Sequence, residues 1–198
     1  MLGFDVERGD RWLERWLPSI AAHAAGGPVL ELGCGKGRDS AELAAAGMPV
    51  IGLDRSAVAI ASARGRVPSG AFHCQDIRAR FPVADESIGV VLASLSLHYF
   101  DWPQTTGLVE RVRRTLRPGG MLLCRVNSTN DHRHGASGHP AIAENFYLVE
   151  GRPKRFFDRA AVDRLFAGGW RSLACEEKVI DRYDLPKSVW EVALERAT

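Results

Sequence analysis

The chain has 198 residues and a mass of 21.7 kDa, the size of one ordinary domain, with 45% hydrophobic and 25% charged residues. This composition excludes long disorder, and a chain of this length can bury a sizeable core without disulfides or structural metals. The 26 basic and 24 acidic residues leave a formal charge of +2, which gives no support to a dedicated nucleic-acid binder. We therefore expect one domain over residues 1–198.

The spacing of the cysteines and the lengths of the apolar segments bear on the cellular location of the protein. The four cysteines are widely spaced and form no CxxC pair, which fits neither a disulfide framework nor a zinc ribbon. The first residues carry charges instead of an apolar run, and no apolar stretch is long enough to cross a membrane. The sequence predicts a cytoplasmic protein without nucleic-acid or membrane partners, and it leaves the oligomeric state open.

The first half of the chain alternates between helical and strand patterns. Residues 5–23, within an N-terminal segment 1–25, predict an amphipathic helix with an apolar stripe at Trp12, Leu13, Trp16 and Leu17. Short apolar runs predict buried strands at 29–32, 49–53 and 71–75. Helices are predicted between them at 39–46, ended by Gly47, and at 57–66, where Ser56 is placed to cap the first turn.

The second half repeats this alternation with one interruption. Strands are predicted at 87–93 and 121–126, and between them apolar residues at helical spacing, Leu108 to Leu116, lead to a stop at Pro118-Gly119-Gly120. Residues 127–156 are polar and histidine-rich without periodicity, and they predict a long loop. A helix at 158–167 and strands at 170–179 and 189–194 follow.

Together these elements predict an α/β fold: a Rossmann-like, doubly wound, mostly parallel seven-stranded sheet with helices on both faces. In such open sheets, ligands bind beyond the carboxyl ends of the strands. Each segment that follows a strand should therefore line one edge, and these segments are Gly33–Gly37, Asp54, Asp76, Ser94–Tyr99 and the loop from Asn127.

The glycine-rich loop after the first strand carries the strongest signal. Gly33, Gly35 and Gly37 alternate, so the backbone can turn sharply and approach a ligand. A nicotinamide site prefers GxGxxG, but Arg38 stands where its last glycine would fall. Asp54 ends the next strand, where a ribose diol needs an acceptor, and Asp76 ends the third. Both could instead serve only as helix caps or turn residues.

At this point the sequence resembles the class I S-adenosylmethionine-dependent methyltransferases. ELGCGKG (31–37) is similar to their first motif, GLDRS (52–56) to their ribose-binding strand end, and QDI (75–77) to their adenine-side motif. LRPGG (116–120) is also typical of them, and the resemblance runs from Val29 to the closing WEVALER (190–196).

The resemblance implies S-adenosylmethionine as cofactor and a role for each matched residue. The three loop glycines and their neighbour Cys34 would surround its methionine part, with Glu31 near the charged end. Asp54, beside Arg55, would accept both ribose hydroxyls, and Asp76 the adenine amino group. The remaining cofactor contacts implied are Ile77 against the adenine ring and Ser94 and Leu95 at the methionine end.

Two residues next to the expected methyl position, His98 and Tyr99, are candidate catalytic residues. His98 would act as a base and Tyr99 would orient a substrate; the alternative is that both pack under or cap the following helix. The Asn/Asp-Pro-Pro-aromatic motif of methyltransferases that act on nucleic-acid bases is absent at Ala93-Ser94-Leu95-Ser96. This absence argues against a DNA substrate.

The segment 127–156 is predicted to be a substrate-side loop or lid, with Asn127, Asn130 and Tyr147 as candidate substrate contacts. The alternative is a solvated loop. His132, His134 and His139 lack a supporting metal-site pattern, so we predict no metal. The basic residues Arg152, Lys154 and Arg155 either attract an anionic substrate or form a solvated basic turn.

The sequence thus predicts an enzyme that transfers a methyl group from S-adenosylmethionine to an O, N, S or soft chalcogen nucleophile of a small molecule. Residues 33–54 are loosely similar to the tellurite-resistance and thiopurine-like methyltransferases. The alternatives are a non-catalytic S-adenosylmethionine sensor or scaffold and, less favoured, a nicotinamide oxidoreductase. The acceptor itself stays open.

Overall fold

The computed structural model describes residues 11–181 and 184–197. Its main sheet has seven strands in the order β3-β2-β1-β4-β5-β10-β9. All are parallel except β10, which pairs antiparallel with β5 and β9. The predicted seven-stranded, mostly parallel sheet is confirmed. The strands are β1 (Val29–Leu32), β2 (Val50–Asp54), β3 (Ala71–Cys74), β4 (Ile88–Ser94), β5 (Leu116–Asn127), β9 (Trp170–Ile180) and β10 (Lys187–Arg196).

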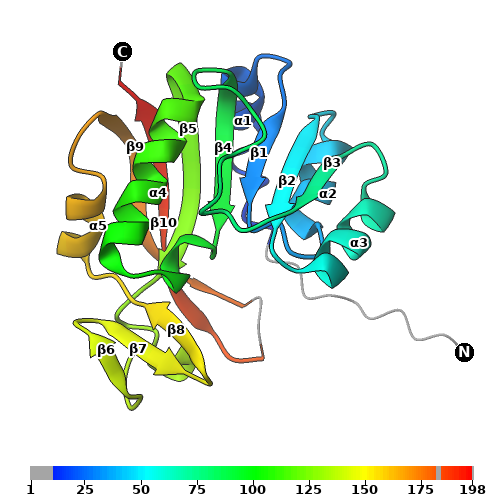
Figure 1. The fold of residues 1–198 in the computed structure, drawn as a ribbon. Coiled ribbons are helices and arrows are strands. Elements are labelled where there is room, and N and C mark those ends of the chain that lie inside the picture. The colour runs from blue at the N-terminus through cyan, green and yellow to red at the C-terminus, as the bar shows by residue number, and fades with distance from the viewer. Residues whose placement is uncertain (1–10, 182–183, 198) are drawn as a thin grey trace, which may run out of the picture.

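Helices cover both faces of this sheet (Figure 1). One face carries α1 (Leu17–Ala24), α2 (Arg38–Ala45) and α3 (Ala57–Arg66), and the other carries α4 (Trp102–Thr115) and α5 (Arg159–Leu165). Three of the helices begin at a side-chain cap, a local signal that the sequence supplies. The caps are Ser56 for α3, as predicted, Asp101 for α4 and Asp158 for α5.

The N-terminal helix is shorter than the sequence predicts. Residues 5–10 of the predicted helix lie outside the described residues, and residues 12–16 form turns before α1 begins at Leu17. Proline is tolerated only in the first turn of a helix, so Pro18 fixes the start at this place. Trp12 and Leu13 are nevertheless buried against the sheet.

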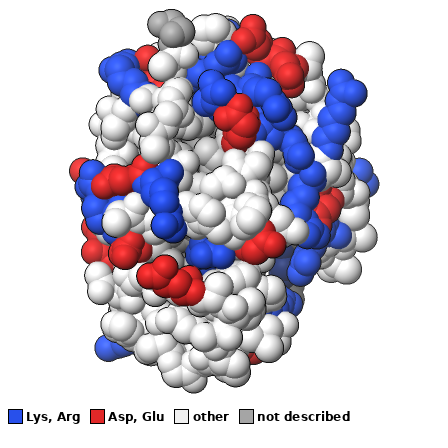
Figure 2. Space-filling view, turned by 60° about the vertical axis from the view of Figure 1, so that its left-hand side comes forward, with Lys and Arg blue, Asp and Glu red and all other residues white. Residues whose placement is uncertain are grey.

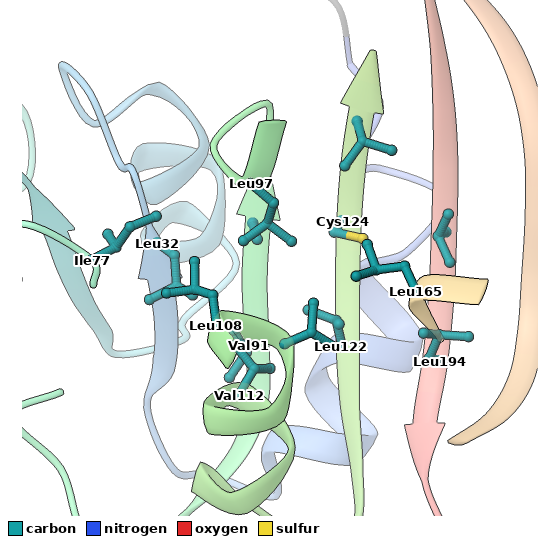
Figure 3. Close-up of a cluster of buried hydrophobic side chains, with 14 of the residues drawn as sticks. Leu32, Ile77, Val91, Leu97, Leu108, Val112, Leu122, Cys124, Leu165 and Leu194 are labelled. Atoms are coloured by element: carbon teal, nitrogen blue, oxygen red, sulfur yellow. The ribbon is translucent and has the colours of Figure 1, made fainter. Parts of the chain in front are cut away.

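The largest hydrophobic cluster lies between the sheet and α4 (Figure 3). Leu108 and Val112 of α4 point toward Val91 of β4 and Leu122 of β5, and all four are almost fully buried. Each such side chain contributes roughly 1.5–3 kcal/mol by leaving water. This packing holds the carboxyl ends of β1, β4 and β5 in one row.

The segment 127–156 is where the predicted loop differs from the structure. It forms a three-stranded antiparallel sheet below the main one (Figure 1), together with a short 3-10 helix, η2 (His132–His134). Its hairpins turn at Asn145 and Glu150, both at positive φ, and strands of three or four residues are too short to show periodicity. The strands are β6 (Ala141–Ala143), β7 (Phe146–Val149) and β8 (Arg152–Arg155).

No helix in the described part of the chain has the length and apolar character needed to span a membrane.

Candidate functional site

The strand order places a crevice between β1 and β4, because the chain leaves these neighbours in opposite directions across the sheet. The segments that follow them are the loop 33–37 and the short 3-10 helix η1 (Leu97–Tyr99). These segments meet closely: a Cβ added to Gly33 would lie 2.6 Å from Cβ of Ser96. Glycine at position 33 is therefore what allows the two to lie side by side.

The other loop glycines have different surroundings. A Cβ at Gly37 would lie 3.0 Å from the backbone of Ala63 in α3, so this glycine allows close helix packing. A Cβ at Gly35 would meet nothing within 4 Å, so this part of the loop faces open space. The backbone N–H of Gly35 donates to Oδ2 of Asp54 at 2.9 Å. Only Gly35 of the three thus combines an open face with a contact to the end of β2.

A large cavity of about 860 Å³ extends from this crevice to the small sheet. Asp54, Arg55, Asp76, Ile77 and Arg78 line it on the side of β2 and β3, and Gly33, Ser96, Tyr99, Phe100, Asp101 and Gln104 line its middle. Its far wall consists of Ile142, Phe146, Gly151, Arg152 and Pro153. A second cavity of about 260 Å³ lies behind the glycine loop and is lined by Glu31, Gly33, Cys34, Gly35, Lys36, Arg38, Asp39, Arg66 and Ser94.

The two strand-end carboxylates are held by local hydrogen bonds. Oδ1 of Asp54 accepts from the backbone N–H of Ser56 at 2.8 Å, and Oδ2 accepts from Gly35. Asp76 accepts two guanidinium hydrogen bonds from Arg78, at 2.7 and 3.0 Å, and these lower the pKa of its carboxyl group. Both groups are therefore fixed in orientation at the edge of the large cavity. Both oxygens of Asp54 and Oδ2 of Asp76 have a further lone pair, whereas Oδ1 of Asp76 also accepts from the backbone N–H of Arg78.

The back of the second cavity is a buried polar cluster. The carboxylate of Glu31, 3% exposed, accepts a hydrogen bond from Ser40 Oγ. Ser94 Oγ accepts from Nε and an Nη of Arg125, at 3.1 and 3.0 Å. The Arg125 guanidinium is fully buried, and its Cζ lies 4.0 Å from the ring centroid of Trp12. The N-terminal segment thus packs against this cluster through Trp12.

Beyond β4, three buried polar atoms have no hydrogen-bond partner among the residues that the structure describes: Ser96 Oγ, His98 Nδ1 and Asn127 Oδ1. His98 is 2% exposed, and its ring centroid lies 4.3 Å from that of Tyr99. Burial, with the nearby ammonium groups of Lys187 and Lys154, lowers the pKa of His98 well below its usual 6.5. The imidazole is therefore neutral at pH 7. A buried polar atom without a hydrogen bond lowers the stability of the folded chain. These three atoms are therefore candidates for contact with a polar ligand.

The remaining predicted cofactor and substrate contacts lie at the ends of β4 and β5 and in the segment 127–156. Leu95 adopts a positive φ of 57°, and its N–H donates to the carbonyl of Arg125 at 2.9 Å, which ties the loop after β4 to β5. Asn127 is fully buried and donates from Nδ2 to the carbonyl of Arg155 at 3.4 Å. Asn130 is exposed and donates to Glu177 at 2.8 Å, and Tyr147 packs on Phe156. Neither Asn130 nor Tyr147 lines the two cavities.

The histidines of the segment 127–156 do not converge. His132 Nδ1 lies 3.3 Å from Ser137 Oγ, and His134 Nε2 lies 3.1 Å from the carbonyl of Leu185. Among residues 11–181 and 184–197, no three His, Cys, Asp or Glu side chains are grouped to hold a metal ion.

Two features of the site escaped the sequence reasoning. The sequence carried a usable signal for Arg125, because a lone charge within the apolar run of a buried strand is rarely tolerated without a role. The small-sheet residues Ile142, Phe146 and Pro153 gave no such signal, since only the hairpins bring them over the crevice.

Residues 29–120 match the family model described as a methyltransferase domain. A demethylmenaquinone methyltransferase of Beutenbergia cavernae is 37% identical over 118 residues, 60% of this chain and 48% of that protein. A trans-aconitate 2-methyltransferase of Paracidovorax citrulli is 37% identical over 111 residues, 54% of this chain and 40% of that protein. The chain therefore spans less than half the length of each of these curated relatives.

A solved S-adenosylmethionine-dependent methyltransferase of Methanosarcina mazei has the same fold. Its TM-score is 0.76 at 19% identity, with 86% of this chain and 92% of that chain covered. Because 86% of this chain is covered, the likeness in fold extends beyond the residues that the family model matches.

Proposed function

We propose that this chain, which belongs to the class I S-adenosylmethionine-dependent methyltransferases, transfers a methyl group from S-adenosylmethionine to a small-molecule acceptor. The observation that carries the proposal is the hydrogen bond between Gly35 and Asp54, at the edge of a cavity that also reaches Ser96, whose Oγ has no hydrogen-bond partner among the described residues. The cavity thus has carboxylate acceptors on the side of β2 and β3 and Ser96 in its middle.

The residues present fit the cofactor. The Asp54 carboxylate faces the large cavity and has lone pairs for both ribose hydroxyls, while Asp76 and Ile77 stand beside it for the adenine edge. The second cavity, behind the open face of Gly35, suits the methionine end, with Glu31 and Ser94 at its back. A total cavity of this size exceeds the needs of one small ligand, so room is left for an acceptor.

The bound cofactor supplies an activated methyl group on a sulfonium, so the residues of the chain need only align the acceptor and exclude water. We propose Tyr99 and His98 for this role, because Tyr99 lines the cavity and His98 stacks on it from the buried side. A neutral imidazole of lowered pKa is a weak base, so His98 serves best as a hydrogen-bond partner that orients the acceptor. Ser96 Oγ and Asn127 Oδ1 are further candidates for this orientation.

Two observations support a small acceptor. Figure 2 shows acidic side chains among the basic ones over the upper and middle parts of one face and a largely uncharged lower part, and the formal net charge of the chain is only +2. The relatives named above are methyltransferases whose names give small molecules as substrates. The cytoplasmic location, the absence of nucleic-acid and membrane partners, and the finer tellurite- or thiopurine-like resemblance stay predictions.

The test combines binding with turnover. Calorimetry of the full chain should show binding of S-adenosylmethionine in preference to NADH, and a small-molecule panel should contain acceptors that release S-adenosylhomocysteine. His98→Ala should slow turnover more than it weakens cofactor binding. Cofactor binding without turnover on any acceptor would favour a sensor or scaffold, and preferential binding of NADH would overturn the proposal.

A further inference from the structure

Strand β8 carries three cations within four residues, Arg152-Pro153-Lys154-Arg155, and lies beside η1 at the far wall of the large cavity. Surface cations are usually balanced by nearby carboxylates. Within the described part of the chain, however, none of these three cations forms an ion pair with a carboxylate. The positive charge of β8 is therefore not neutralised locally.

Arg155 is the most informative of the three because it is only 6% exposed. Its guanidinium makes one long hydrogen bond, from Nε to the carbonyl of Phe100 at 3.4 Å. Its Cζ lies 4.5 Å from the ring centroid of Phe146 and 5.5 Å from that of Trp102. A cation this deeply buried is normally paired, so its terminal N–H groups stand ready for an anion.

The pairing of β8 shows which way Arg155 faces. Alternate residues of a strand share a face, so Arg155 lies on the same face as Pro153, and its partner across the hairpin is Phe146. Pro153 and Phe146 both line the large cavity, and Phe100 does so as well. Arg155 thus lies on the face of the small sheet that carries these lining residues and is itself buried behind them, while Arg152, on the opposite face of β8, lines the cavity directly.

Further charged side chains lie near Arg155 and η1. Arg164 stacks on Trp102 at 4.1 Å, and Lys154 and Lys187 both act on His98 electrostatically. Two acidic residues oppose them: Asp131 is paired with Lys187 at 2.6 Å, and Asp101 faces Arg155 while capping α4. Of the charged side chains named here and on β8, five are basic and two are acidic.

Beside these cations the wall is apolar. Ile142 is 52% exposed and Tyr99 39% exposed, and both line the cavity together with Phe146. Large apolar side chains exposed toward one cavity are suited to cover the apolar body of a ligand.

We propose that the methyl acceptor is a small molecule with an apolar body and an oxyanion, a carboxylate or a phosphate. Arg155 and Arg152 bind the oxyanion, and Phe146, Ile142 and Tyr99 contact the body. The inference rests on the proposed function, because it names the substrate class of the same site. The guanidinium fork matches both oxyanions, so the test separates them.

The probes are trans-cinnamate, its neutral amide and phenyl phosphate, titrated into the full chain with and without saturating S-adenosylhomocysteine. Binding is followed by ligand-observed NMR. At least one of the two anions should bind on the order of tenfold more tightly than the amide, and its affinity should fall as sodium chloride is added. Tighter cinnamate binding identifies a carboxylate acceptor, and tighter phenyl phosphate binding a phosphate acceptor.

Arg155→Gln should reduce anion affinity to the level of the amide while leaving the affinity for S-adenosylhomocysteine unchanged. Arg171→Gln is the matched control, because it removes the same charge from an exposed residue of β9. If Arg155→Gln lowers the Tm substantially, Arg152→Gln carries the test, since Arg152 is exposed and its replacement leaves the interior intact.

Equal binding of anions and amide, or anion binding that both arginine variants retain in full, would overturn the inference and leave the proposed function standing. Failure of S-adenosylhomocysteine to bind would overturn the proposed function, while the titrations without it would still decide the anion site.

Discussion

The backbone N–H of Gly35 donates a 2.9 Å hydrogen bond to Oδ2 of Asp54, which joins the loop after β1 to the end of β2. The same carboxylate holds the first residue beyond β2 through the N–H of Ser56. Asp54 therefore fixes the loop after β1 relative to the end of β2, and these two hydrogen bonds orient its carboxylate.

Asp54→Ala is expected to weaken binding of S-adenosylhomocysteine on the order of a hundredfold, because two charge-assisted hydrogen bonds to the ribose are lost. Calorimetry measures the affinity, and circular dichroism verifies the fold. Asp85→Ala, at an exposed turn position, is the control and should bind normally. An unchanged affinity in Asp54→Ala would refute the assignment of this site.

Two glycine variants should separate packing from ligand access. Gly35→Ala places its Cβ in open space at a φ of 53°, so we expect a stability loss of about 1 kcal/mol and weakened cofactor binding. Gly33→Ala has a similar φ of 74° but also collides with Ser96, so its loss of stability should be clearly larger. Urea denaturation gives both values. Equal stability losses would contradict the close contact between the loop and η1.

The buried His98 predicts a pH dependence of stability. Its pKa is well below 6.5 in the folded chain, so below pH 6.5 the unfolded chain binds a proton that the folded chain excludes. The free energy of unfolding should therefore fall as the pH is lowered from 7 to 5, by up to about 1.4 kcal/mol per pH unit from this residue.

Urea denaturation at several pH values measures this slope, and His98→Gln removes the titrating group at similar size. The variant should show a shallower slope between pH 5 and 7. The carboxylates with lowered pKa values, such as Glu110 and Glu195, act with the same sign but at lower pH, below about 4.5. An identical slope in His98→Gln would show that His98 titrates normally.

Lys187 and Asp131 form a buried ion pair at 2.6 Å, with side chains 8% and 1% exposed. Lys187→Met leaves the Asp131 carboxylate buried without its cation, so it should cost about 3–5 kcal/mol of unfolding free energy. The double variant Lys187→Met with Asp131→Asn should recover part of this loss, because the uncompensated charge is gone. Thermal or urea unfolding checks both variants, and a double variant no better than the single one would argue against an energetic pair.

Local sequence patterns were sufficient to predict the seven-stranded main sheet. Apolar runs such as Val29–Leu32 and Ile88–Ser94 cannot be hidden except between two helical layers, and capping residues such as Ser56 fix where helices begin. The alternation of these elements then fixes the edge of the sheet at which Gly35, Asp54 and Asp76 meet. The strands and helix starts depend on residues that are close in sequence, and the sheet edge depends on the right-handed connection between parallel strands. Both can be predicted from the spacing of residue types along the chain.

Tertiary structure alone decided the other half of the site. The size and charge balance of the chain indicated one domain with a small partner, yet they gave no sign that Arg125 is buried beneath Trp12 or that Arg155 is buried beside Phe146. The hairpins of β6–β8 are too short for periodicity to reveal. Their position depends on long-range packing against η1, so this wall of the large cavity exists only in the folded chain.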